Sequence, residues 1–492
     1  MIIVRLERLL AAAAAAAGLL AWVVFFADGL TLTHYDARAH LVVARRVIDN
    51  LTPGWQQIGA VWLPLPHLIN LLPAQVDALY RTGAFASLVS VASLALAAWA
   101  MARLVLLVTG SSAGAVAATL LLVLNANLLY LHATPMTEPL LLASVLLVVL
   151  WLYEWTNAGG GAVPRRLGWA LLAAAWTRYE AWPVICAAVG AALFALWRSG
   201  MSAPLLARRA WPLVGWPAAA IALFLVNSRI TTGSWLVTAG FYVPDPHYAG
   251  QLWRTVVGIW WGTHQLSSYI VELAGLAGAT WVAGRAFTSR AHAAQLIPVA
   301  LFAAAALPLY AFYSGHPYRI RYMVPVVVSC TLFAGVAAGA LGRLRPPLGP
   351  LAAAALVSSL LTASPLRHIE RAPFVAEAQW DVPASLNRRA VTACLADYGG
   401  EKVLASMGSL AHYMHELAGA GFDLADFIHE GNGVIWELAL ETGPALHAGW
   451  MLVEEAAEGG DVLARRVRAD TGFTRGMTRV CEGGGVALYR RN

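Results

Sequence analysis

The chain has 492 residues, of which 59% are hydrophobic and only 12% are charged, and its mean hydropathy is +0.63. Ordinary soluble domains carry about 25% charged residues. This composition therefore excludes a soluble globular enzyme, a disordered chain and a disulfide-rich miniprotein, and it leaves a polytopic helical membrane protein. The formal net charge of +6 comes almost wholly from arginine, because Lys402 is the only lysine. The arginines form no basic run with interleaved aromatics, which disfavours nucleic acid and favours membrane lipid as a partner.

The apolar segments predict about eleven membrane spans, since one spanning helix needs about 20 apolar residues. They lie near residues 9–27, 84–108, 113–131, 136–153, 167–180, 181–197, 211–229, 265–284, 293–313, 322–341 and 348–364. Arg5 and Arg8 precede the first span, as in a signal peptide. Because so many spans follow, we interpret this span as an uncleaved anchor.

The arginine distribution predicts the orientation of the spans. Positive residues gather in cytoplasmic loops, and a cytoplasmic N-terminus places Arg5, Arg8, Arg165, Arg166 and Arg343 on that side. An odd number of spans then puts the C-terminal segment outside. We expect a multi-pass protein of the bacterial cytoplasmic (inner) membrane with an extracytoplasmic active site.

Two regions differ from the spans and suggest the domain organisation. The outer loop 28–82 begins with an amphipathic helix over 35–51, in which Arg45 and Asp49 pair at i,i+4. We expect this helix to lie in the membrane interface and assign the loop to a transmembrane domain over 1–369. Residues 370–492 carry more charge and form the second domain.

The second domain is predicted to be a small extracytoplasmic α/β domain. Its strand-like runs are Lys402–Met407, Leu424–Ile428, Trp450–Glu454 and Gly485–Tyr489, and its helix-like runs are Ser385–Tyr398 and Gly433–His447. Cys394 and Cys481 would face an oxidising compartment there. They either form a disulfide or stay buried apart as thiols.

Two acids stand where apolar spans begin or end. Asp36 follows the first span and shares a helix face with His40, while Glu138 opens the fourth span ahead of Pro139. Ionisable groups beside spans are costly and point to function, so the two acids are candidates for acid/base work or for holding a divalent cation. The alternative for both is a role at a helix N-terminus.

Arginines mark two further outer segments. Arg178 and Glu180 lie between the fifth and sixth spans, where they either serve a site or neutralise one another. Arg319 and Arg321 open a late span, and guanidinium groups match phosphate oxygens. A lipid headgroup and a substrate phosphate are equally suited to these two arginines.

Together the segments resemble the GT-C superfamily of polyprenyl-phosphate-sugar-dependent glycosyltransferases. The resemblance rests on the His-Tyr-Asp36 segment, the Thr-Glu138-Pro segment, the Tyr-Arg319-Ile-Arg321-Tyr segment and the outer α/β domain. The superfamily includes protein O-mannosyltransferases, the aminoarabinose transferase of lipid A and oligosaccharyltransferase catalytic subunits. In this chain Asp36 is followed by Ala37 and lacks the paired acid that is usual in the family.

The resemblance implies a hexosyl- or pentosyltransferase that moves a sugar from a polyprenyl-phosphate donor to an extracytoplasmic glycan, lipid or protein by inverting single displacement. Asp36 would be the base and Glu138 the second catalytic acid, while Arg321, Arg319 and Arg178 would hold the donor phosphate. The expected substrate-lining residues are His40, Trp62, Glu180, Tyr242, Asp245, His247 and His316. A transporter or flippase of polyprenyl-linked lipids and a non-catalytic membrane assembly factor are the alternatives, and a divalent metal stays open.

Overall fold

The computed structural model describes residues 2–237, 242–364, 366–397, 399–457 and 460–492. It divides into two compact units. Unit 1 comprises Met1–Asp28, Ser87–Phe224 and Asp245–Glu377, and unit 2 comprises Gly29–Ala86, Leu225–Pro244 and Ala378–Asn492. The boundary after Glu377 lies close to the predicted one at 369/370. The outer loop, which the sequence analysis grouped with the transmembrane domain, instead packs in the same unit as the C-terminal segment.

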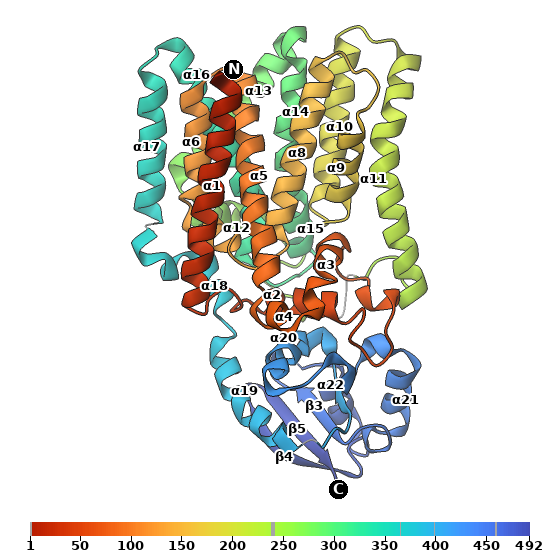
Figure 1. Ribbon diagram of the computed structural model, residues 1–492. Helices are drawn as coiled ribbons and strands as arrows, with labels where there is room; N and C mark the ends of the chain where they lie inside the picture. The colour runs from red at the N-terminus through yellow and green to blue at the C-terminus, as the bar shows by residue number, and fades with distance from the viewer. Residues whose placement is uncertain (1, 238–241, 365, 398, 458–459) are drawn as a thin grey trace. The chain divides into compact units, whose positions relative to one another are not determined.

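The described part of unit 1 consists of helices (Figure 1). They are α1 (Ile2–Ala27), α5 (Ala84–Thr109), α6 (Ser112–Val123), α7 (Ala126–Leu131), α8 (Glu138–Asn157), α9 (Arg165–Ala175), α10 (Ala181–Arg198), α11 (Ala203–Thr232), α12 (Leu252–Gln265), α13 (Tyr269–Thr288), η3 (Arg290–Gln295), α14 (Leu296–Val299), η4 (Ala300–Ala305), α15 (Ala306–Tyr313), η5 (Ile320–Met323), α16 (Val324–Leu344), α17 (Leu348–Ala363), η6 (Leu366–Arg371) and α18 (Pro373–Ala378). The last residues of α11 and α18 and the first of α5 belong to unit 2.

Seven helical segments of the described chain are long and apolar enough to cross a membrane, and the bent pair α12–α13 raises the number to eight. The predicted number of about eleven was larger. Three of the predicted spans correspond to helices of only 12, 11 and 16 residues, namely α6, α9 and α17. The span predicted at 265–284 lies in the bent pair, whose axes turn by 112°. The predicted class, a polytopic helical membrane protein with a small C-terminal sheet domain, is confirmed.

Glycines allow close contact between α13 and α16. A Cβ atom at Gly275 would lie 2.5 Å from the carbonyl oxygen of Cys330, and one at Gly278 would overlap the carbonyl group of Phe333. Without a hydrophobic driving force between helices in lipid, packing at short distance is what holds such helices together. These two glycines therefore set the separation of α13 and α16.

We expect Gly278→Ala to lower the free energy of unfolding by about 1–3 kcal/mol, the usual cost of overpacking. Gly284→Ala in the same helix is the matched control, because a Cβ atom there has no neighbour within 4 Å. Thermal unfolding of the two variants in detergent measures the difference. Equal melting temperatures would show that the α13–α16 contact is not set by Gly278.

Unit 2 contains the outer loop and the sheet domain. Its helices and strands are α2 (Tyr35–Arg45), η1 (Trp55–Ile58), α3 (Leu65–Asn70), η2 (Pro73–Gln75), α4 (Asp77–Thr82), α19 (Val382–Cys394), η7 (Leu395–Asp397), β1 (Val403–Ala405), α20 (Met407–Leu417), η8 (Ala418–Ala420), η9 (Leu424–Asp426), β2 (Phe427–Ile428), η10 (Glu430–Asn432), α21 (Val434–Thr442), η11 (Pro444–Leu446), β3 (Trp450–Glu454), α22 (Val462–Ala469), β4 (Met477–Gly483) and β5 (Val486–Arg491).

The five strands form one mixed sheet in the order β2-β1-β3-β5-β4. Strand β1 pairs in parallel with β2 and β3, and β5 runs antiparallel to both β3 and β4. The four predicted strands correspond to β1, β2, β3 and β5, and the two predicted helices to α19 and α21. Strand β4, which the analysis missed, is a largely exposed edge strand. The analysis also missed α20 and α22.

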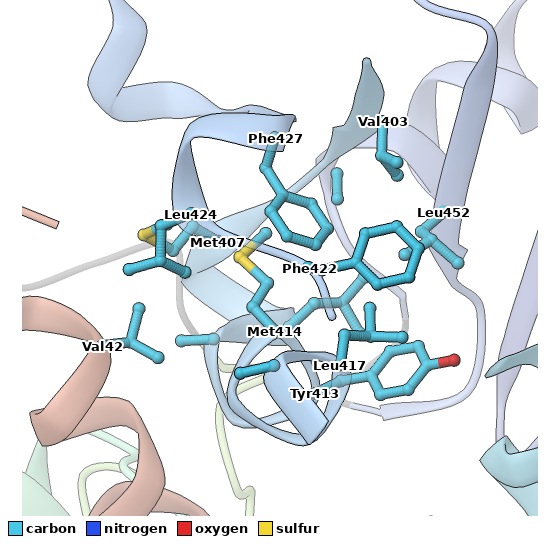
Figure 2. Packing of buried hydrophobic residues seen from close by; sticks show 14 of the residues in the cluster. Val42, Val403, Met407, Tyr413, Met414, Leu417, Phe422, Leu424, Phe427 and Leu452 are labelled. Carbon is cyan, nitrogen blue, oxygen red and sulfur yellow. The ribbon is translucent and has the colours of Figure 1, made fainter. Parts of the chain in front are cut away.

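Both faces of the sheet are covered, as the alternation in β3 shows. Leu452 and Val403 belong to one core cluster, and Met451 and Leu404 belong to another. Residues from helices α19 and α20 enter the first cluster, and residues from α21 and α22 enter the second. Helix α2 of the outer loop also reaches the first cluster, where Val42 lies near Met407 and Met414 (Figure 2).

Helix α2 is shorter and more buried than predicted. It ends at Arg45, whereas the prediction ran to residue 51, and Ile48, which lies within the predicted range, is 49% exposed. Asp36–Arg45 are all buried, so α2 is a core helix of unit 2. The predicted pair is present, since Arg45 Nε lies 2.7 Å from Asp49 Oδ2 beyond the helix end.

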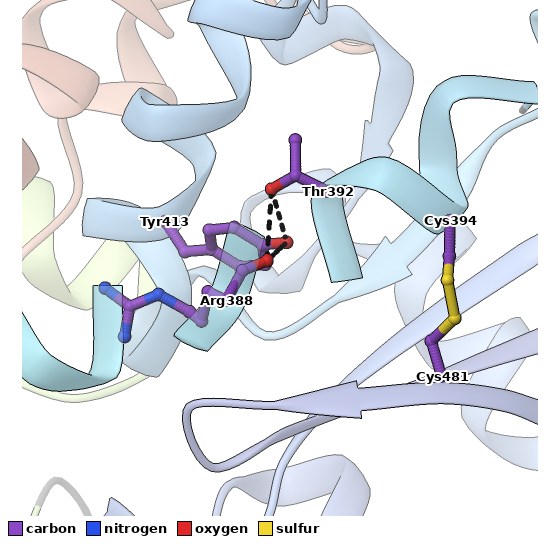
Figure 3. The surroundings of a disulfide bond; sticks show 5 residues. All are labelled: Arg388, Thr392, Cys394, Tyr413 and Cys481. Atoms are coloured by element: carbon purple, nitrogen blue, oxygen red, sulfur yellow. Dashed lines mark hydrogen bonds between the residues drawn. A yellow bond between two sulfur atoms is a disulfide. The ribbon is translucent and has the colours of Figure 1, made fainter. Parts of the chain in front are cut away.

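Cys394 and Cys481 form a disulfide bond, the first of the two alternatives (Figure 3). The bond joins α19 to the edge strand β4, and their Cα atoms lie 6.6 Å apart. Helix α19 is thereby attached covalently to the sheet. Cys186 and Cys330 are free thiols.

Candidate functional site

Four predicted site residues of unit 1 meet in one buried cluster, which we call the Arg178–Arg321 cluster. Glu138 opens α8, Arg178 and Glu180 lie in the turn between α9 and α10, and Arg321 lies in η5 just before α16. One carboxylate oxygen of Glu138 stands 3.2 Å from Nη1 of Arg178 and 3.1 Å from Nη1 of Arg321. The Nη2 atom of Arg178 lies 2.8 Å from Glu180. Three chain segments thus converge on a single carboxylate.

The cluster is compensated within itself. Glu138 is 1% exposed, Glu180 2% and Arg321 5%. Unpaired charges at such burial are strongly unfavourable, and here Glu138 contacts both arginines while Glu180 contacts Arg178. Burial lowers the pKa of Arg178, but the charges of Glu138 and Glu180 outweigh it and raise the pKa above its usual value. The two carboxylates therefore favour the charged form of Arg178.

A carboxylate from the end of unit 1 supports the arginine segment. The Oε2 atom of Glu377, in α18, accepts a hydrogen bond of 2.7 Å from the backbone N–H of Ile320, between Arg319 and Arg321. Burial raises the pKa of Glu377, while this hydrogen bond and the two arginine charges oppose the rise. The sequence analysis missed Glu377. Its one signal was an acid inside the apolar run Pro-Phe-Val-Ala-Glu-Ala.

Three more predicted residues of unit 1 lie in two loops that contact each other. Asp245 donates its backbone N–H to the carbonyl of Gly315 at 2.7 Å and accepts the N–H of His247 on its side chain at 2.9 Å. The neighbouring His316 has its ring Nε2 3.3 Å from the hydroxyl of Tyr322. The backbone contact between Asp245 and Gly315 thus brings the segment of Asp245 and His247 beside that of His316.

The predicted base lies in unit 2. Asp36 is in the first turn of α2, where the ring Nδ1 of His34 accepts its backbone N–H at 3.1 Å. Asp36 is 6% exposed. A carboxylate in a first helical turn is favoured by the helix dipole. Asp36 therefore has the position near a helix N-terminus that the sequence analysis gave as the alternative. That position is compatible with a further function.

His40 lies one helical turn beyond Asp36 and contacts a second predicted residue, Trp62. The ring of His40 has its Nδ1 3.1 Å from Nε2 of His67, and its centroid lies 4.2 Å from that of Trp62. Burial, with the nearby charges of His40 and Arg46, lowers the pKa of His67 well below its usual value. His67 was not predicted. Tyr242, the last of the predicted residues, is half-buried in the short 225–244 segment of unit 2.

The predicted residues thus form an arginine–glutamate cluster and a loop pair in unit 1, and an acid with its histidine neighbours in unit 2. Among the described residues, no group of three or more His, Cys, Asp or Glu side chains is arranged to hold a metal ion.

The fold and these clusters define a class: a multi-pass helical membrane protein with buried ion clusters and an appended mixed-sheet domain. No protein-family model matches the sequence, and no curated protein matches it. The fold is similar to that of ArnT from Cupriavidus metallidurans, whose crystal structure is in the apo state. The TM-score is 0.58, the likeness covers 97% of each chain, and 12% of the residues are identical. At this identity the likeness is one of fold.

We expect Glu138→Ala to lower the free energy of unfolding by about 3–5 kcal/mol, because it leaves the buried Arg321 and the half-buried Arg178 without the carboxylate between them. The matched control is Glu154→Ala near the other end of α8, whose carboxylate pairs with Arg103 at 2.6 Å but is 18% exposed. Melting temperatures in detergent compare the two. A smaller loss for Glu138→Ala than for Glu154→Ala would contradict the central place of Glu138 in the cluster.

Proposed function

We propose that the protein is a GT-C type glycosyltransferase that moves a sugar from a polyprenyl-phosphate-linked donor to an extracytoplasmic acceptor. The observation that carries the proposal is the Arg178–Arg321 cluster, one buried and one half-buried arginine in a membrane fold similar to that of ArnT, an aminoarabinose transferase. A buried anion-binding group of this kind suits a substrate that carries both a lipid chain and a phosphate.

The donor end of the proposed reaction needs cations. As the bond from the sugar to the phosphate breaks, negative charge grows on the leaving phosphate, and preorganised guanidinium groups stabilise it without having to lose a proton. We assign this role to Arg321, with Arg319 beside it. Glu138 shares one oxygen between Arg178 and Arg321, a position suited to orienting these arginines.

The acceptor end needs a base. In an inverting single displacement, the acceptor hydroxyl oxygen bonds to the anomeric carbon, the polyprenyl phosphate leaves with the bonding electrons, and the hydroxyl proton passes to a carboxylate. We assign the proton acceptor to Asp36, a carboxylate in the first turn of α2. His40, Trp62 and the loop residues Asp245, His247 and His316 remain our candidates for contacts to the sugar.

We further propose that the N-terminus is cytoplasmic and that the sheet domain is extracytoplasmic, in a bacterial inner membrane. The disulfide between Cys394 and Cys481 supports this placement, since such bonds form and persist in oxidising compartments. The arginine distribution of the loops supports the same orientation.

A reporter enzyme that is active only outside the cytoplasm, fused after Asn492, is expected to be active. Mass mapping without reduction should find Cys394 joined to Cys481 in protein taken from cells under thiol-blocking conditions. An active cytoplasm-only reporter, together with two free thiols, would overturn both the orientation and the extracytoplasmic acceptor.

The proposed roles predict different losses on substitution. Asp36→Asn keeps the shape and removes the base, so turnover should fall by about 10²–10⁴-fold with donor affinity unchanged. Arg321→Ala should weaken donor binding and also slow transfer, and Arg321→Lys should restore only part of both because lysine lacks the planar pair of donors. Donor binding and sugar transfer by detergent-purified protein measure these effects.

The controls are Asp28→Asn, an exposed acid near Asp36 in sequence, and Arg345→Ala, an exposed arginine at the opposite end of α16 from Arg321. Both should behave as the unmodified protein. Normal turnover in Asp36→Asn would remove Asp36 as the base. Donor binding without any sugar transfer by the unmodified protein would favour the alternative of a transporter or flippase.

A further inference from the structure

A second ion cluster lies in unit 2, two residues from Asp36. The guanidinium group of Arg38 contacts Asp381 at 2.8 Å through Nη2 and contacts the carboxylate of Glu416 through Nη1. Asp381 directly precedes the first residue of α19, and Glu416 lies near the end of α20. Arg38 is 6% exposed and Asp381 2%. Helix α2 is therefore joined to two helices of the sheet domain through one buried side chain.

A second arginine completes this cluster. Arg388 of α19 approaches both oxygens of Asp381, at 3.1 and 2.8 Å, and lies 2.7 Å from Glu416 Oε1. It is 1% exposed, and its guanidinium carbon lies 5.3 Å from the ring centroid of Tyr413. Two arginines and two carboxylates again balance. Burial raises the pKa of Asp381, but the hydrogen bond from Arg388 and the nearby positive charges lower it more, so the carboxylate is ionised at neutral pH.

The helices that hold the carboxylates of this cluster are themselves fixed to the sheet domain. Asp381 directly precedes α19 and Arg388 lies within it. The disulfide between Cys394 and Cys481 attaches this helix to β4, as Figure 3 shows. Helix α20, which carries Glu416, contributes Leu410, Met414 and Leu417 to the core beneath it. The two carboxylates thus belong to elements that are themselves fixed in unit 2.

Helix geometry relates this cluster to Asp36. Successive residues of an α-helix turn by about 100°, so Arg38 points to nearly the opposite side of α2 from Asp36, whereas His40 lies on nearly the same side. An anchor on one side of the helix fixes its rotation about its own axis. It thereby fixes where a carboxylate on the other side points, without contacting that carboxylate.

We propose that Arg38, held by Asp381, Glu416 and Arg388, is a positioning residue that sets the orientation of Asp36. The inference rests on the proposed role of Asp36 as the base. It goes beyond that role, since it assigns to the sheet domain the task of aligning the base. A buried ion cluster is suited to this task, because its directional contacts admit fewer helix rotations than apolar packing does.

The test is a double-mutant cycle between positions 38 and 36. Arg38→Met keeps the length of the side chain and removes its charge. It should lower kcat by about 10–100-fold, the scale expected for a misplaced catalytic group, with KM for the donor changed by less than about 2-fold. In an Asp36→Asn background the same substitution should lower kcat by less than about 3-fold, because the group it aligns is already inactive. Arg38→Lys should recover part of the loss.

Asp381→Asn is the second variant. It keeps the side-chain shape and one acceptor oxygen, so it tests the same contact with less effect on folding, and it should show the same dependence on Asp36. Amide hydrogen exchange over residues 36–45 should quicken in both variants. The control is Asp77→Asn, which removes a 58%-exposed partner of Arg45 at the other end of α2 and should leave kcat and exchange near their usual values.

Two results would overturn the inference. One is an equal loss from Arg38→Met with and without Asp36, which would show that Arg38 acts independently. The other is unchanged exchange in α2 in both variants. Failure of the proposed function is separate: it would show as normal turnover in Asp36→Asn alone, or as no sugar transfer by the unmodified protein.

Discussion

Buried arginines held between carboxylates are the constraint around which both units are organised. A guanidinium group has several donors and stays charged, so an apolar interior accepts it only where carboxylates compensate the charge and take the hydrogen bonds. In unit 1, Arg178 and Arg321 share Glu138. In unit 2, Arg38 and Arg388 share Asp381 and Glu416. Each cluster forms only where side chains from several segments of the chain meet.

This requirement relates stability to the proposed chemistry. The groups that would bind a donor phosphate are the same groups that neutralise Glu138 and Glu180 in the apo protein, so an arriving phosphate would compete with internal carboxylates for the arginines. Under the proposal, the contacts of Glu138 with both arginines would hold the guanidinium groups in place before the phosphate binds. In unit 2 the cluster has a different proposed use, because Arg38 lies on nearly the opposite side of α2 from Asp36 and would orient the helix that carries it.

The close contact of α13 and α16 shows how helices of the membrane part associate without a hydrophobic driving force. Lipid supplies no hydrophobic drive for helix association, so glycines let two backbones approach to contact distance. The sheet domain follows the rule for water-soluble folds, with side chains of β3 alternating between two cores and helices covering both faces. The helices of the membrane part therefore pack through close backbone contact, and the sheet domain packs through buried apolar side chains.

Several features could be predicted from the sequence. Apolar segment length and low charge indicated a polytopic membrane protein, because hydrocarbon admits few other compositions. Strand-like runs such as Trp450–Glu454, alternating with helix-like runs, indicated a small α/β domain. The expensive acids and arginines beside the spans, Glu138 and Arg321 among them, were found because burying a charge without a partner is unfavourable wherever it happens.

Other features depended on contacts between distant segments. Helix α2 seemed amphipathic, yet it is buried on all sides because Val42 and Arg38 meet elements more than 330 residues later in the chain. Glu377 and Arg388 carried no motif, since their importance comes from the groups facing them. The number of full-length spans was overestimated because composition does not show where a helix ends or bends, as between α12 and α13. Local sequence determined which segments are apolar and which charges need partners, and only the tertiary structure decided which partners they have.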